Sequence, residues 1–69
     1  MKGIGQQYFD YIDYCFELET GDCVFVEVES NIGVDEAREY LEKQVDCEVV
    51  DYIGEYSVEE AEMLGYDTF

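Results

Sequence analysis

Apolar and polar side chains alternate along two neighbouring segments in the first half of the chain. The apolar positions of the first segment, residues 11–19, are Ile12, Tyr14, Phe16 and Leu18. Those of the second segment, residues 23–29, are Val24, Val26 and Val28. This period of two is typical of half-buried β-strands, and Thr20-Gly21-Asp22 between them indicates a turn. We predict a hairpin in which Glu19 pairs with Cys23, because a slip of one residue would turn the carboxylates into the core.

The middle of the chain changes to helical spacing and then returns to a strand pattern. A helix is predicted over residues 34–45, whose apolar stripe is Val34, Ala37, Leu41 and Val45. Residues 47–53 are rich in β-branched side chains, which predicts a third strand that ends at Gly54.

A second, shorter helix is predicted near the C-terminus. Ser57 followed by Glu60 forms a capping-box pattern, and Gly65 stands where a left-handed C-cap would end the helix after Leu64. Residues 6–11 are ambiguous, because their apolar spacing also suits a helical turn. The predicted fold is α+β: a small antiparallel sheet, made of the hairpin plus a third strand, packed against one main helix, with a short C-terminal helix.

A weak repeat with an offset of 24 residues relates the two strand–helix segments. Val34-Asp35-Glu36-Ala37 returns as Val58-Glu59-Glu60-Ala61, and Asp22-Cys23 returns as Asp46-Cys47. Two explanations stay open: a duplication, or two similar β-α units built by the same local rules.

Composition narrows the class of protein. The 69 residues predict a single domain, residues 1–69, and carry 19 acidic against 3 basic side chains and no histidine, for a net charge of −16. An apolar content of 48% with 16% aromatics favours a folded chain over a disordered one. No apolar run approaches the roughly 20 residues of a membrane helix, and the first residues lack the apolar stretch of a signal peptide, so we expect a cytoplasmic protein.

The sequence lacks the residue patterns that enzymatic catalysis and metal binding need. Without histidine there is no imidazole base and no Ser–His or Cys–His pair, so we expect no catalytic residue and no cofactor. The acidic residues do not follow the spacing of a calcium-binding loop, and three cysteines without a C-x-x-C pair predict reduced thiols and no metal site. Cys15 and Cys23 fall on the outer face of the hairpin, and Cys47 joins them if the repeat holds.

The arrangement of the charge carries the functional hypothesis. The outer face of the hairpin is predicted to display Asp13, Glu17, Glu19, Glu27 and Glu29, and the main helix a solvent stripe of Asp35, Glu39 and Glu42. Such rows have intervals of roughly 6.5–7 Å along a strand and about 5–6 Å along a helix, and adjacent phosphates of one DNA strand rise about 3.4 Å. Phe25 is predicted within the acidic face as an exposed contact anchor.

In size, in acidic balance and in the rows Glu17/Glu19/Glu27/Glu29 and Asp35/Glu39/Glu42, the chain resembles the small, acidic, non-enzymatic DNA-mimic inhibitors that phages and mobile elements encode, including many anti-CRISPR proteins. The resemblance covers the character of the whole chain and includes no sequence motif, and these inhibitors share no common fold. It implies an inhibitor in the host cytoplasm that occupies the basic nucleic-acid-binding surface of a defence effector, such as a CRISPR complex or a nuclease. It implies no direct contact with nucleic acid or membrane.

A different class of protein is the alternative. The chain would then be a small accessory or oligomerisation module, a homodimer through an exposed patch of Cys15, Cys23 and Phe25, and its acidity would only keep it soluble. A net charge of about 2–8 suffices for solubility in a small domain, so −16 favours the inhibitor hypothesis.

Overall fold

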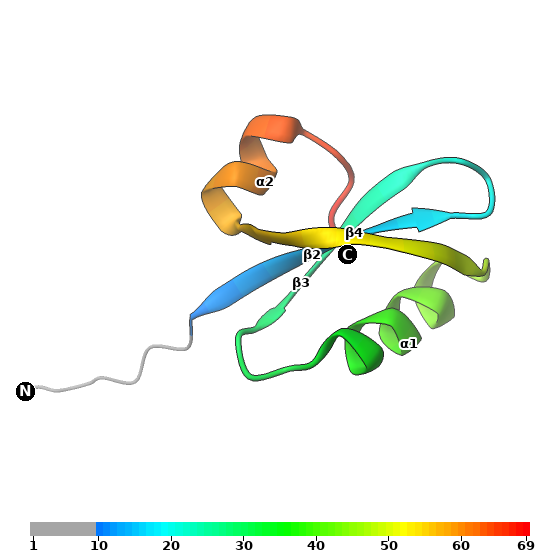
Figure 1. Ribbon diagram of the computed structural model, residues 1–69, viewed down its shortest axis with the longest axis horizontal. Coiled ribbons are helices and arrows are strands. Elements are labelled where there is room, and N and C mark those ends of the chain that lie inside the picture. Colours follow the sequence, from blue (N-terminus) through cyan, green and yellow to red (C-terminus); the bar gives the residue numbers. More distant parts are fainter. Residues whose placement is uncertain (1–9) are drawn as a thin grey trace, which may run out of the picture.

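The computed structural model describes residues 10–69, which form three strands and two helices (Figure 1). The elements are β2 (Tyr11–Leu18), β3 (Cys23–Glu29), α1 (Val34–Val45), β4 (Val49–Ser57) and α2 (Val58–Leu64). All strand pairs are antiparallel and the sheet order is β3-β2-β4, so β2 is the central strand. The predicted α+β fold and the order of its elements are confirmed. The ambiguous segment 6–11 lies outside the described residues except for its last two positions.

The hairpin of β2 and β3 has a register that differs by two residues from the predicted one. Cys23 pairs with Glu17 and not with Glu19. The loop closes earlier because the N–H of Gly21 donates to the C=O of Leu18 at 2.8 Å. Gly21 has a φ of +94°, the left-handed conformation that a three-residue hairpin loop favours and that glycine adopts without strain. Because the shift is even, each side chain keeps its predicted face.

The third strand differs from the prediction at both ends, since β4 begins at Val49 and passes through Gly54. Gly54 and Tyr52 pair with consecutive residues of β2, which leaves Ile53 as the extra residue of a bulge. A second register shift leaves Val50 unpaired in the same way. The glycine therefore marks an irregularity inside the strand, where the sequence pattern suggested an end.

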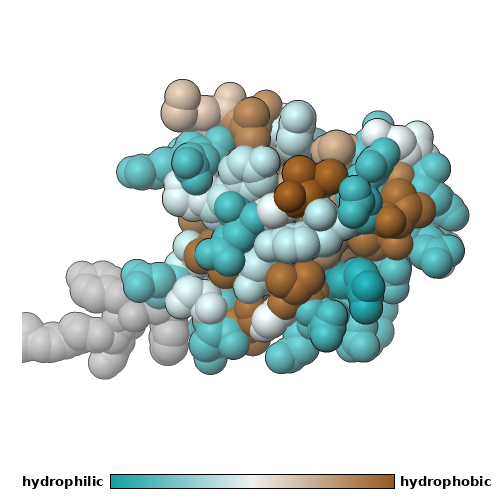
Figure 2. All heavy atoms as spheres, in the orientation of Figure 1, coloured by the Kyte–Doolittle hydropathy of each residue, from teal (hydrophilic) through white to brown (hydrophobic). Residues whose placement is uncertain are grey.

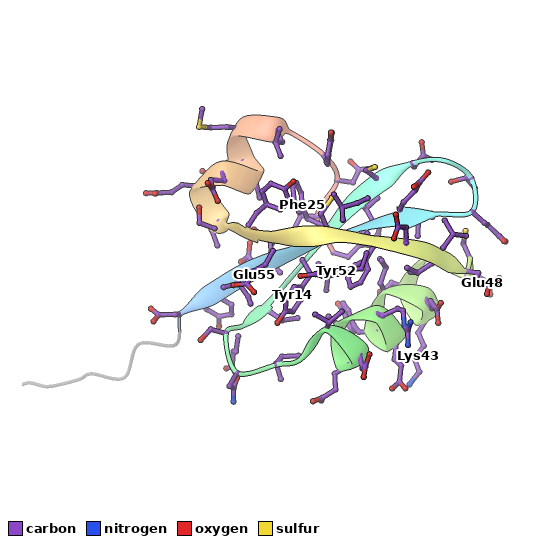
Figure 3. The ribbon with its side chains drawn as sticks, viewed as in Figure 1. Tyr14, Phe25, Lys43, Glu48, Tyr52 and Glu55 are labelled. Atoms are coloured by element: carbon purple, nitrogen blue, oxygen red, sulfur yellow. The ribbon has the colours of Figure 1, made fainter. Side chains whose placement is uncertain are left out.

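One face of the sheet is covered by α1 with its predicted stripe. Ala37 and Leu41 are buried, and the helix packs on a core to which the sheet contributes Tyr14, Phe16, Leu18, Val24 and Val26. Tyr14 also donates a hydrogen bond of 2.7 Å from its hydroxyl to the C=O of Ile32, in the loop that leads into the helix. Tyr14 and Tyr52 lie beside one another between the sheet and α1, with ring centroids 6.0 Å apart (Figure 3).

The opposite face of the sheet is covered as well, by α2 and by Tyr66, whose ring stacks on that of Phe25, and residues 67–69 then pair along the outer edge of β3 (Figure 1). Ala61 of α2 packs with Cys15 and Phe25 in a second small core. The chain then runs parallel to β3: Phe25 donates its N–H to the C=O of Asp67, and Phe69 donates its N–H to the C=O of Phe25, each at 2.8 Å. The sheet thus lies between two covering layers, where the sequence predicted one main helix.

The caps of α2 match the sequence. The Ser57 hydroxyl accepts from the N–H of Glu60 at 3.1 Å, and the Glu60 carboxylate accepts from the N–H of Ser57 at 3.0 Å. Gly65 ends the helix at a φ of +75°. Both helices begin at the repeat-related valines, Val34 and Val58, but they pack on opposite faces of the sheet. Within residues 10–69 no helix is long and apolar enough to cross a membrane.

We expect Ser57→Ala to lower the free energy of unfolding by about 0.5–2 kcal/mol, because the capping hydroxyl fixes the start of α2. Ser30→Ala is the matched control, since Ser30 is exposed in a turn and its observed hydrogen bond is made by the backbone N–H. That control should change the stability by less than about 0.5 kcal/mol. Denaturant unfolding followed by circular dichroism measures both, and equal stabilities would show that the capping hydroxyl of Ser57 does not stabilise the fold.

Candidate protein-interaction surface

The surface charge is almost unopposed by internal ion pairs. All nineteen acidic residues lie within residues 10–69, whereas only Arg38 and Lys43 of the basic residues do, both on α1. One ion pair forms in this part of the chain, between Nη2 of Arg38 and the carboxylate of Asp35 at 3.8 Å. Its side chains are largely exposed, so it contributes little. The exposed carboxylates therefore remain available to an external cation.

Tertiary structure gathers six carboxylates at one end of the sheet, where the β2–β3 loop meets the start of β4. We call this group the acidic end: Glu17, Glu19, Asp22, Asp46, Glu48 and Asp51. Two backbone contacts bring its segments together. The N–H of Glu19 donates to the C=O of Glu48 at 3.0 Å. Glu17 of β2 pairs with Asp51 of the adjacent strand β4. Five of the six are exposed and Glu17 is half-buried. Figure 3 shows Glu48 at this end, near the end of α1 that carries Lys43.

Asp46 occupies its place in the acidic end at a cost to local stability. It is the C-cap of α1 and has a φ of +52°, a left-handed conformation that glycine or asparagine adopts more readily. Its carboxylate also stands at the helix C-terminus, where the helix dipole favours a cation. Aspartate tolerates the left-handed conformation better than most residues, so the unfavourable feature is its negative charge at the helix C-terminus.

The predicted row on the hairpin is not continuous. Glu17 and Glu19 belong to the acidic end, whereas Glu27 and Glu29 lie toward the other end of the hairpin, opposite Asp13 and Tyr11. Between the two pairs, α2 and the C-terminal residues cover the face. Glu27 is exposed and Glu29 half-buried, so both can reach a partner, but as part of a separate group.

Two predicted contact residues on this face are buried, and the prediction that they are displayed is wrong. Phe25 is 0% exposed and contacts Tyr56 edge-on and Tyr66 face-on, with ring centroids 5.4 and 5.5 Å away. Asp13 is 1% exposed. The alternation of the strand correctly assigned both residues to the outer face, but that face lies beneath α2 and the C-terminal residues. Figure 3 shows Phe25 inside this layer.

The helix stripe is only partly displayed. Asp35 and Glu39 are exposed as predicted. Glu42 is half-buried, because its carboxylate turns toward β4 and accepts from the N–H of Val49 at 3.0 Å. Glu42 therefore has a structural contact, and a partner can reach Asp35 and Glu39 more freely.

The cysteines do not form the exposed patch that a homodimer was expected to use. Cys15 is buried, Cys23 is half-buried beside it, and Phe25 lies in the same core. Burial raises the pKa of the Cys15 thiol. Cys47 packs instead against the core under α1, so the repeat does not place it with the other two. Within residues 10–69 no group of three His, Cys, Asp or Glu side chains is arranged to hold a metal ion.

Asp13 forms an isolated acidic site inside the protein. Its Oδ1 atom is buried without a hydrogen-bond partner among the described residues, and Tyr56 is its strand neighbour on β4. Burial raises the pKa of Asp13 from 3.8 to about 6, with further contributions from the negative charges of Glu27 and Glu62. Ionisation of this residue therefore opposes folding at neutral pH.

Sequence reasoning missed four members of the acidic end: Asp22, Asp46, Glu48 and Asp51. Asp22, Asp46 and Glu48 lie outside the strands, where no periodic pattern assigns a direction to the side chain, and Asp51 lies in β4 beside a register shift that interrupts the alternation. The only signal in the sequence was the concentration of acidic residues around both turns.

Comparison with known proteins adds no family to these observations: no protein-family model, curated protein or solved structure matches the chain.

We expect Asp13→Asn to stabilise the protein at pH 7.5 and to have little effect near pH 4. The folded state holds the Asp13 proton more tightly than the unfolded state does, so the stability due to this residue is complete below about pH 4 and is lost as the pH rises through about 6. The shift corresponds to at most about 3 kcal/mol.

The measurement is the free energy of unfolding of both proteins across this pH range, with the carboxyl carbon shift of Asp13 followed by NMR. The other carboxylates are common to the two proteins, so the difference between their pH profiles isolates Asp13. Parallel profiles, or an NMR midpoint near 4, would contradict the assignment.

Proposed function

We propose that this chain is a non-enzymatic binding protein that occupies the basic, nucleic-acid-binding surface of another protein through its acidic end. The observation that carries the proposal is the excess of nineteen carboxylates over two basic side chains in residues 10–69, with a single exposed ion pair among them. A protein with this charge attracts a positively charged surface at long range and repels nucleic acid and anionic membranes.

The spacing of the acidic end supports mimicry of a phosphate backbone. Glu17 and Asp51 lie opposite one another on neighbouring strands, which places their Cβ atoms about 4.5–5.5 Å apart. The loop residues Glu19 and Glu48 extend the group along a second line, tied by their backbone hydrogen bond. Duplex DNA presents one charge per about 1.7 Å of its axis, so closely spaced carboxylates from several segments approach such a density better than one strand does.

The location of Asp46 supports the same function. The helix dipole favours a cation at this end of α1, whereas Asp46 places a further negative charge in the acidic end. The partner class follows from the charge and from the resemblance to DNA-mimic inhibitors: a nucleic-acid-binding effector or nuclease of a host defence system, met in the cytoplasm. In this function the protein blocks a site and catalyses no reaction.

The test is capture of proteins from a bacterial lysate cleared of nucleic acid, with the chain immobilised. Retained proteins should be nucleic-acid-binding proteins that duplex DNA displaces, and they should be released when salt is raised from about 50 to about 200 mM, since screening weakens such contacts by orders of magnitude. Retention that persists in both treatments would contradict mimicry.

A charge variant of the acidic end localises the effect. Glu19→Gln, Asp46→Asn and Glu48→Gln together should weaken binding of the captured partner at least tenfold and leave the protein folded, because Asp46→Asn relieves an unfavourable C-cap. The matched control removes three exposed charges elsewhere, with Asp10→Asn, Glu36→Gln and Glu55→Gln. Equal losses in the two variants would mean that net charge alone, and not the acidic end, determines binding.

A further inference from the structure

The most exposed large apolar side chain described is Met63, on the outer side of α2, at 88% exposure. Its neighbour Leu64 is 46% exposed, and together with Tyr56 and Glu60 they line a shallow groove of about 330 Å³. We call these four residues the α2 groove. Figure 2 shows apolar surface over α2, bordered by hydrophilic side chains. An apolar centre with a charged border is the usual composition of a protein interface.

Two walls of the α2 groove are fixed before any partner binds. Tyr56 is held edge-on against the buried ring of Phe25, with centroids 5.4 Å apart. Glu60 is held by its hydrogen bond of 3.0 Å from the N–H of Ser57, within the capping box. Met63 forms an adaptable wall of the groove, because its unbranched thioether side chain can adjust to the shape of the group that it contacts. Fixed walls reduce the ordering cost of binding.

The charge around the groove determines what can occupy it. Residues 44–69 contain no lysine or arginine, and α2 itself carries Glu59, Glu60 and Glu62. A second copy of the chain would bring the same charges to the same place, and an anionic bilayer would be repelled. The complementary occupant is a polypeptide segment that combines a large apolar side chain with flanking lysines or arginines.

We propose that the α2 groove binds the apolar side chain of a cationic segment of the partner protein, and so supplies the contact anchor that buried Phe25 cannot supply. This inference rests on the proposed function for the charge of the partner. The α2 groove adds a second contact, separate from the acidic end. Through this contact the protein would distinguish a basic protein surface that carries apolar side chains from a polycation that carries none.

The experiment uses two peptides of equal charge, Lys-Lys-Leu-Leu-Lys-Lys and Lys-Lys-Ser-Ser-Lys-Lys, titrated into the full-length chain. NMR of the methionine methyl groups and of the backbone amides reports affinity and location. The leucine peptide should bind about tenfold more tightly than the serine peptide and should shift the Met63 methyl signal.

Met63→Gln should remove this preference without changing stability, because the side chain is exposed and glutamine is a good helix former. Ile53→Thr is the matched control: it removes an exposed apolar side chain from β4, away from the α2 groove, and should keep the preference. A wild-type protein that binds both peptides equally, or a preference that survives Met63→Gln, would overturn the inference.

The same titrations keep the two proposals apart. The serine peptide and the acidic-end variant report on the electrostatic contact, whereas the ratio between the two peptides reports on the α2 groove. Serine-peptide binding that is unchanged in the acidic-end variant, with the leucine preference retained, would refute the acidic end as the charged contact and leave the groove supported.

Discussion

Burial of β2 on both of its faces is the constraint on which the rest of the structure depends. Residues 13–16 are consecutive in the central strand and all four are buried. A chain this short gains little stability from one apolar layer, so covering a second face adds burial that it needs. That second cover consists of α2 and Tyr66 over the buried ring of Phe25, and residues 67–69 fix its position because the backbone of Asp67 and Phe69 forms two hydrogen bonds with Phe25 at the edge of β3.

The double cover also decides where the charge is found. A sheet with one open face would carry its carboxylates in rows along that face. Here α2 and the C-terminal residues cover the middle of it, so the carboxylates concentrate in loops and at strand ends, most densely at the acidic end. One carboxylate, Asp13, stays inside with an unpartnered oxygen and a raised pKa. The fold tolerates an ionisable group in its core and a carboxylate at the helix C-terminus, which are both unfavourable for stability.

The same constraint determines which apolar side chains are buried and which are exposed. Three aromatic side chains of the strands, Tyr14, Phe16 and Phe25, are buried, including the one expected to contact a partner. The exposed aliphatic side chains come from the bulged residues of β4, Val50 and Ile53, and from the outer side of α2, Met63 and Leu64. The α2 side is bordered only by negative charge, so an apolar contact and an electrostatic contact occur together on the protein without sharing residues.

Local rules in the sequence were sufficient for the order of the elements and for the side on which each residue of β2 and β3 lies. The period of two in β2 and β3, the stripe of α1 and the capping box at Ser57 each depend on neighbours within a few positions, and each is confirmed. Only the tertiary structure decided which faces are open. Segments that are distant in the sequence pack together, and this packing decides that Phe25 is a core residue and not a contact. The same packing brings Glu19 next to Glu48. Such contacts follow from the packing of the whole chain, and periodicity carries no information about them.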